Sequence, residues 1–206
     1  MDGVLLDSQS AHFIAFREVL KKYDFEVSDE AFKPTFGMTN EQVVRHVSGG
    51  RFTDAQVEKI CREKDEQFRV VIAKEAKFMD GVQDWLAAFK RAGLRQALAS
   101  SGSWENIYTI LDALSARPYF DAVVSGEDCA SKPDPTVFLR AASQLNVDPL
   151  ACLVIEDSIA GIQAAAAAGM KCLAVATTFS LEKLPKTDLV LADLTGLKAE
   201  MLAGLF

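Results

Sequence analysis

Acidic, hydroxyl and ammonium side chains stand where short apolar runs of this sequence end. The set comprises Asp2, Ser100, Ser101, Lys132, Glu156 and Asp157. Carboxylate oxygens are the ligands that a hard cation such as Mg²⁺ prefers. Lysine and hydroxyl groups suit a phosphate. Together these residue types suit phosphoryl transfer, in which the protein supplies positioning and neutralises charge.

From residue 79 onward, apolar runs alternate with helical patterns. Strands are predicted at 95–99, 120–125, 152–155, 171–176 and 189–191, and helices at 82–92, 104–114, 134–145 and 160–168. This alternation predicts a parallel sheet with helices on both faces. Ligands bind at the carboxyl ends of the strands in such sheets. We therefore expect the polar side chains that follow the strands to converge on one site.

Residues 10–75 form a helical block without a convincing strand. Helical spacing of apolar residues covers 9–25, 40–47 and 54–74, and Ser28 begins a further short helix. Thr53 and Gln56 have the spacing of a capping box. The predicted fold is therefore α/β: a Rossmann-like parallel-sheet core at 1–9 and 79–206, with a helical cap domain inserted at 10–78.

Bulk properties exclude several classes of protein. The net charge of −7 argues against a nucleic-acid surface and a polybasic membrane patch. No apolar run approaches the roughly 20 residues that span a bilayer, and no secretory leader is recognisable. The four cysteines lack metal-ligand spacing, which predicts reduced thiols in a cytoplasmic protein. Nothing in the sequence indicates an oligomeric state.

Four segments carry a resemblance to a known family. DGVLLDS, ALASSGS, SKPDP and VIEDSIAGI resemble, in order, the four signature motifs of the haloacid dehalogenase-like hydrolases. The helical insert between the first two resembles the subclass with a cap at that place. The resemblance covers essentially the whole chain, and the nearest pattern is that of phosphatases and β-phosphoglucomutase-like members.

The resemblance implies roles for the residues at the strand ends. Asp2 resembles the general acid/base, which protonates the leaving oxygen and later activates water. Ser100, with the amide of Ser101, resembles the phosphate-binding second motif. Lys132 resembles the lysine that neutralises the nucleophile and the phosphate.

The resemblance also implies a Mg²⁺ cofactor. Asp157 resembles a ligand of the metal, and Glu156 resembles its direct or water-mediated partner. The main-chain carbonyl of Asp2 would supply a further ligand. The implied substrate is a small phosphorylated metabolite such as a sugar phosphate.

Three residues of the helical insert match the mutase-like members in part. His12 stands where they carry a histidine that helps to position the acid/base, although a partly buried structural histidine is an alternative. Thr39 and Asn40 belong to the matching substrate loop, or else to solvated surface. Asn40 replaces the arginine with which the mutases grip a second phosphate. That departure favours a monophosphate phosphatase over a mutase.

The family's nucleophile is an aspartate two positions before the acid/base, and here it would precede Met1. The strand that ends on it is the centre of the sheet. Such a strand buries about four large apolar side chains, worth roughly 1.5–3 kcal/mol each. We therefore expect Met1 to be an internal methionine of a longer natural chain. We also expect a gap, or a substitute strand, between the strands that end at Ser100 and at Glu156.

Two functional classes follow. The first is a Mg²⁺-dependent phosphatase that works through an aspartyl-phosphate when the missing strand is present, with a phosphosugar mutase as its alternative. The second is a noncatalytic binder of phosphate ligands, with a dehalogenase as a weaker third option. In either case, no aspartyl-phosphate turnover is expected of the 206 residues alone.

Overall fold

The computed structural model describes residues 1–35 and 38–206, which form two compact units. The sheet unit consists of residues 1–7 and 77–206, and the helical unit of residues 8–76. The sequence analysis placed the corresponding boundaries after residues 9 and 78.

The helical unit is built from amphipathic helices. Its elements are α1 (Gln9–Lys21), α2 (Asp29–Phe32), the 3₁₀ helix η1 (Lys33–Thr35), α3 (Asn40–Ser48) and α4 (Asp54–Glu75). α1 packs along α4, and buried apolar residues such as Phe16, Leu20 and Ile60 fill the space among the helices. The predicted capping box of Thr53 and Gln56 is present at the start of α4. Residues 36–37 of the predicted loop at 33–39 lie outside the described residues.

The strands of the sheet unit pair in parallel, as the alternation predicted. β1 (Ala97–Ser100) pairs with β2 (Ala122–Ser125). β3 (Leu153–Glu156) pairs with β4 (Lys171–Val175), which pairs with β5 (Leu189–Leu191). The fold is therefore α/β with parallel strands, and the strand ends that carry polar residues are carboxyl ends.

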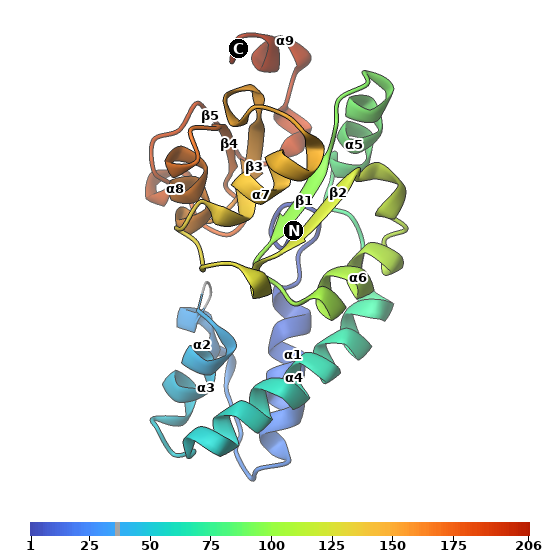
Figure 1. Ribbon diagram of the computed structural model, residues 1–206. Coiled ribbons are helices and arrows are strands. Elements are labelled where there is room, and N and C mark those ends of the chain that lie inside the picture. Colours follow the sequence, from blue (N-terminus) through green and yellow to red (C-terminus); the bar gives the residue numbers. More distant parts are fainter. Residues whose placement is uncertain (36–37) are drawn as a thin grey trace. The chain divides into compact units, whose positions relative to one another are not determined.

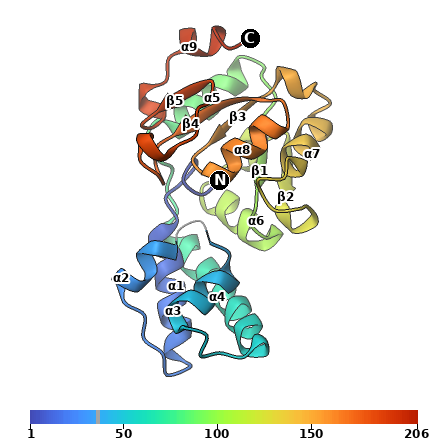
Figure 2. The same ribbon diagram turned by 90° about the vertical axis from the view of Figure 1, so that its left-hand side faces the viewer.

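Helices cover the strands on both faces (Figures 1 and 2). The helices are α5 (Val82–Arg91), α6 (Trp104–Ala113), α7 (Thr136–Leu145), α8 (Ile159–Ala167) and α9 (Ala199–Ala203). Short 3₁₀ helices are η2 (Arg117–Tyr119), η3 (Gly126–Asp128), η4 (Pro149–Ala151), η5 (Leu181–Lys183) and η6 (Leu194–Gly196). α7 packs on β1 and β2, and α8 packs on β3 and β4. None of the described helices combines the length and apolar character needed to cross a bilayer.

The strands form two separate sheets. One has the order β1-β2 and the other β3-β4-β5, and no pairing joins β1 to β3 among the described residues. A cavity of about 650 Å³ is lined by residues 97–99 of β1 and 153–155 of β3. The predicted gap between the strands that end at Ser100 and Glu156 is therefore confirmed.

The opening octet does not fill this gap, because it folds back on itself. The amides of Val4 and Leu5 donate to the carbonyl of Met1, at 3.2 and 2.7 Å. The amide of Gly3 donates to the carbonyl of Leu6 at 2.9 Å, and the φ angle of Gly3 is +67°. The octet is thus a tight turn, and not a strand.

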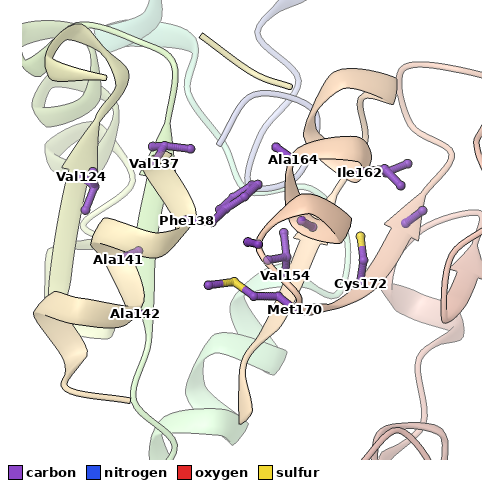
Figure 3. Close-up of a cluster of buried hydrophobic side chains, with 13 residues drawn as sticks. Val124, Val137, Phe138, Ala141, Ala142, Val154, Ile162, Ala164, Met170 and Cys172 are labelled. Carbon is purple, nitrogen blue, oxygen red and sulfur yellow. The ribbon is translucent and has the colours of Figure 1, made fainter. Parts of the chain in front are cut away.

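One apolar cluster links the two sheets on the face covered by α7 and α8 (Figure 3). It includes Val124 of β2, Phe138 of α7, Val154 of β3, Ile162 of α8 and Cys172 of β4. Helix packing therefore holds together two sheets between which the described residues form no ladder of hydrogen bonds.

Glycine at position 81 is required by backbone geometry and by a close neighbour. Gly81 and Gly49 both have positive φ, at +79° and +60°. A Cβ on Gly81 would lie 3.1 Å from backbone atoms of Leu194 and Thr195, whereas one on Gly49 would meet nothing within 4 Å. Gly49→Ala should lower the free energy of unfolding by about 1 kcal/mol, through backbone strain alone.

Gly81→Ala should cost more, about 2–4 kcal/mol, because it adds a steric clash to the strain. Urea unfolding of both variants measures the difference. Trp85 fluorescence reports the same contact, since its Nε1 donates to the carbonyl of Leu194 at 3.1 Å. Equal losses for the two variants would contradict the steric argument.

Candidate functional site

Polar side chains gather at the carboxyl ends of the strands in the sheet unit. Ser100 and Ser125 end β1 and β2, Glu156 ends β3 and Asp157 follows it, and Thr178 follows β4. Ser100, Glu156 and Asp157 are buried, with 4%, 6% and 7% of their surface exposed. Buried polar groups at adjacent strand ends are the geometry that the sequence predicted for a ligand site.

Lys132 reaches this site from the loop before α7. Its Nζ forms an ion pair with Oε1 of Glu156, and the two side chains are 12% and 8% exposed. The same Nζ lies 4.6 Å from the ring centre of Phe138. Glu156 is therefore the partner that Lys132 neutralises in this structure.

The second oxygen of Glu156 is bound by the start of the next helix. Oε2 accepts hydrogen bonds from the amides of Asp157 and Ser158 and from Oγ of Ser158, each at 3.0 Å. A Cβ on Gly161 would lie 2.1 Å from Cδ of Glu156. The first turn of α8 can accept this carboxylate only because position 161 carries no side chain.

The surroundings of Glu156 favour its ionised form. Burial alone would raise the pKa of this carboxyl. The charges of Lys132 and of the Met1 amino group outweigh burial and, with the hydrogen bonds from Lys132 and Ser158, hold the pKa at about 2.

Asp157 shows the opposite behaviour. Burial and the negative charge of Glu156 raise the pKa of the Asp157 carboxyl to about 6, against the hydrogen bond from Thr178. Oγ1 of Thr178 donates to Oδ2 of Asp157 at 2.5 Å. Gly3 packs directly on this carboxylate, because a Cβ there would lie 2.0 Å from Oδ2. The structure thus brings Asp157 against the turn that contains Asp2.

The predicted phosphate-binding serines lie beside the same turn. Oγ of Ser100 accepts from the amide of Gly102 at 3.1 Å, and Oγ of Ser125 donates to the carbonyl of Gly102 at 2.7 Å. A Cβ on Gly102 would lie 3.4 Å from Oγ of Ser100 and 3.6 Å from Cε of Met1. Ser101 is exposed. The loop after β1 is therefore held by hydroxyl groups from both strands.

The predicted metal ligands are not gathered into one cluster. Among the described side chains, which exclude those of residues 36, 37 and 128, no three carboxylate, histidine or cysteine groups converge as a metal site. Glu156 is paired with Lys132, whereas Asp157 carries a buried carboxyl whose ionisation Glu156 opposes. A cation would relieve that repulsion. Asp157 and the adjacent backbone of Asp2 are the groups that fit Mg²⁺.

In the helical unit, a buried lysine links two of the predicted residues. Nζ of Lys64 lies 2.9 Å from Nδ1 of His12, 2.9 Å from Oδ1 of Asn40 and 3.1 Å from Oδ1 of Asp65. The side chain of Lys64 is 1% exposed. An ammonium group only donates, so Nδ1 of His12 is the acceptor and its ring proton lies on Nε2. His12 also stacks on Phe68, with ring centres 4.1 Å apart.

Thr39 serves the local structure of α3. Its side chain accepts from the amide of Gln42 at 3.3 Å, and the Gln42 side chain accepts from the amide of Thr39 at 2.9 Å. Asn40 also bonds outside α3, since its Nδ2 donates to both carboxylate oxygens of Asp65, at 3.1 Å each. Thr39 thus caps α3, whereas Asn40 connects α3 to α4.

Two polar residues of these networks escaped the sequence analysis, although each left a signal. Lys64 occupies a position in the apolar stripe of α4, between Ile60 and Phe68, where a lysine should be surrounded by buried side chains. Thr178 follows β4 at its carboxyl end, and the rule that located Ser100 and Asp157 applies equally to it.

Comparison with known proteins agrees with this arrangement. The family model described as haloacid dehalogenase-like hydrolase matches residues 1–175. The β-phosphoglucomutase of Bacillus subtilis (strain 168) is 29% identical over 210 residues, covering 98% of this chain and 91% of that protein. The fructose-1-phosphate phosphatase YqaB of Escherichia coli (strain K12) is 34% identical over 175 residues, covering 82% and 90%.

A solved structure extends the similarity to three dimensions. The crystal structure of CbbY from Rhodobacter sphaeroides in complex with phosphate is similar with a TM-score of 0.86 and 26% sequence identity. The alignment covers 98% of this chain and 96% of that one.

Loss of the Lys64 charge should destabilise the helical unit. Lys64→Met leaves Asp65, Nδ1 of His12 and Oδ1 of Asn40 without their shared donor, which should cost about 1–3 kcal/mol. Lys59→Met is the matched control, because Lys59 lies on the same helix with its side chain 59% exposed. The control should change the free energy of unfolding by less than about 0.5 kcal/mol. Chemical unfolding measures both, and equal stabilities would contradict the network's importance.

Asp157 should lower stability at neutral pH in the absence of divalent cations. Its pKa is 3.8 in the unfolded chain and about 6 in the fold. The folded state therefore binds this proton more tightly, so stability is highest below the unfolded pKa and falls as pH rises through the folded one. Asp157→Asn should be more stable than the parent at pH 7.5, by on the order of 1–3 kcal/mol.

The stability difference between Asp157→Asn and the parent should vanish near pH 4, where the parent is also protonated. Urea unfolding with a chelator present, at both pH values, measures it. Asp84→Asn, at an exposed position of α5, is the matched control. Equal destabilisation of Asp157→Asn at both pH values would show that its surroundings do not disfavour the ionised form of the Asp157 carboxyl.

Proposed function

This chain belongs to the haloacid dehalogenase-like hydrolases, and on that premise we propose that it is a Mg²⁺-dependent phosphatase of small phosphorylated metabolites. We propose further that it works through an aspartyl-phosphate when an aspartate-ended strand occupies the gap between β1 and β3. The observation that supports the proposal is the position of Ser100 and Glu156 at the carboxyl ends of β1 and β3, the strands that flank the gap. Lys132 forms an ion pair with Glu156, and Asp157 is the next residue.

The relatives support the class of substrate. Two of them are named β-phosphoglucomutase and fructose-1-phosphate phosphatase. A third, the hexitol phosphatase B of Escherichia coli (strain K12), is 30% identical over 214 residues. Lys132 supplies a cation and Ser100 a hydroxyl group at the ends of the strands that flank the gap. These groups suit a phosphate dianion.

The proposed reaction has two steps. A carboxylate at the end of the added strand attacks phosphorus, and the bond to the ester oxygen breaks as Asp2 gives that oxygen a proton. Asp2 then takes a proton from water, which attacks the aspartyl-phosphate and releases inorganic phosphate and the original carboxylate. Ser100 and Ser101 would hold the phosphate, and Lys132 would neutralise its charge. Mg²⁺ at Asp157 would supply further neutralisation.

The helical unit bears on the choice between phosphatase and mutase. A mutase needs a cation for the second phosphate of its bisphosphate intermediate, and position 40 holds a neutral asparagine. Both ends of the Asn40 amide are bound by Lys64 and Asp65. We therefore propose hydrolysis as the reaction. In the helical unit, we propose that His12 helps to position the acid/base and that Thr39 and Asn40 contact the substrate.

A noncatalytic phosphate binder is the second candidate. The pairing of Lys132 with Glu156 favours it, because this lysine already has a buried anionic partner in the present chain. Such a protein would bind a sugar phosphate with an affinity that depends on Lys132, and would not turn it over.

A test uses the chain extended at its amino end by an apolar strand that places aspartate immediately before Met1. With Mg²⁺, this protein should hydrolyse 4-nitrophenyl phosphate, whereas the 206-residue chain should not. Asp2→Asn in the extended chain should lower kcat by about 10²–10⁴-fold, the usual contribution of a general acid/base.

Asp80→Asn is the matched control, because Asp80 is exposed and has no proposed role. It should leave kcat unchanged. Full activity of Asp2→Asn would remove the acid/base assignment. Binding of sugar phosphate without turnover by the extended chain would select the noncatalytic class.

A further inference from the structure

The loop between β1 and α6 carries two of the residues that the proposed function assigns to the phosphate. We call residues 100–103 the phosphate loop. β2 lies beside β1, and Ser125 at its end is the register partner of Ser100 (Figure 1). The turn that follows, residues 125–127, therefore begins next to the point where the phosphate loop begins. We call these three residues the β2 turn.

Ser125 joins the β2 turn to the phosphate loop through one hydroxyl group. Its Oγ donates to the carbonyl of Gly102 at 2.7 Å and accepts from the amide of Glu127 at 3.2 Å. Ser125 is 1% exposed. A buried hydroxyl group has one proton to donate, and here the proton is already shared with a backbone carbonyl. Ser125 is therefore placed to hold the phosphate loop and not to contact a substrate.

Gly126 supports the same loop through direct backbone contact. A Cβ at position 126 would lie 2.8 Å from Cα of Ser101 and 3.2 Å from the carbonyl oxygen of Ser100. The φ angle of Gly126 lies outside the left-handed region, so space and not backbone conformation requires glycine here. A side chain at position 126 would therefore push the Ser100–Ser101 peptide away from the β2 turn.

This contact sets the direction of the Ser101 amide. The Ser100–Ser101 peptide is trans. In a planar trans peptide, the carbonyl oxygen and the following Cα lie on one side of the C–N bond, and the amide hydrogen lies on the other. Gly126 packs against the first side, since its added Cβ would meet both of those atoms. The amide hydrogen of Ser101 therefore points away from the β2 turn.

Glu127 holds the far end of the phosphate loop. Its Oε2 accepts from the amide of Trp104, the first residue of α6, at 3.0 Å. The β2 turn thus touches the chain at residues 101, 102 and 104, through a packing contact and two hydrogen bonds. Attachments so close together leave the backbone between β1 and α6 little freedom to rotate its amides.

We propose, given the proposed function, that Ser125 and Gly126 are positioning residues for the substrate phosphate. Both act through the phosphate loop: Ser125 holds the carbonyl of Gly102, and the bare backbone at Gly126 sets the direction of the Ser101 amide. A loop held in one arrangement loses little conformational entropy when it binds a ligand. Displacement of a positioning group by about 1 Å can cost on the order of 10²-fold in rate.

The first test compares Gly126→Ala with Gly196→Ala, because a Cβ at position 196 would meet no described atom within 4 Å. Inorganic phosphate is titrated at a fixed Mg²⁺ concentration into the ¹⁵N-labelled 206-residue chain, and the amide resonances of 101 and 102 report binding. Gly126→Ala should raise the Kd for phosphate by about 10-fold or more, and Gly196→Ala should leave it unchanged. At a temperature where every variant is folded, a loss of stability alone does not change this Kd.

The second test removes the hydroxyl group. Ser125→Ala is matched with Thr187→Ala, because Oγ1 of Thr187 also donates to a backbone carbonyl, that of Cys172 near the start of β4, at 3.0 Å. Ser125→Ala should raise the Kd for phosphate, whereas Thr187→Ala should lower stability and leave the Kd unchanged. In the extended chain, Ser125→Ala and Gly126→Ala should each lower kcat/KM for 4-nitrophenyl phosphate by about 10–100-fold. The glycine pair remains decisive if Ser125→Ala does not fold.

Three results would overturn the positioning roles. They are no phosphate-dependent change at 101 and 102 in the parent chain, a Kd that neither β2-turn variant alters, or an equal rise of the Kd in the controls. The extended chain separates these roles from the proposed function. Phosphate binding that depends on the β2 turn, without turnover, removes the proposed catalysis alone. Turnover that neither variant alters removes the positioning roles alone.

Discussion

A buried strand must satisfy the backbone groups of both its edges, and this requirement governs the sheet unit. β1 and β3 each meet it on one side, through β2 and β4. Their other edges face a cavity and not each other. The two sheets nevertheless stay together, because α7 and α8 bury side chains of both in a single apolar cluster. Hydrophobic packing across the gap is therefore independent of the hydrogen bonding inside it, and among the described residues only the packing is complete.

The electrostatics of the site follow from the same arrangement. Glu156 and Asp157 are neighbours in sequence and both are buried, yet their surroundings drive their pKa values apart. Glu156 has Lys132 and the amides that start α8. Asp157 has one hydroxyl and the repulsion of Glu156. Two carboxyl groups with such different pKa values suit different roles. Ionised Glu156 orients the lysine, and a bound cation would stabilise the ionised form of Asp157.

Sequence periodicity was enough to locate every strand and the long helices, because apolar spacing reflects burial directly. The gap could also be predicted, because the resemblance to the family implies a central strand before the octet. The partners of individual side chains could not. That Lys132 bonds Glu156, or that Gly161 makes room for this carboxylate, depends on distances between segments far apart in sequence. The role of Lys64 could not be predicted from apolar spacing, because a lysine inside an apolar stripe is informative only where it breaks the pattern.

The Lys64 network gives the helical unit a polar connection that apolar packing does not provide. One ammonium group binds side chains from α1, α3 and α4, through His12, Asn40 and Asp65. Apolar packing tolerates small sliding between helices, whereas the two directional hydrogen bonds from this buried cation to α1 and α3 specify a single register. An asparagine in this place accepts from Lys64 and donates to Asp65 at once, which an arginine cannot do because its guanidinium has no acceptor. The residue that weakens the case for a mutase is thus also the one that completes the network.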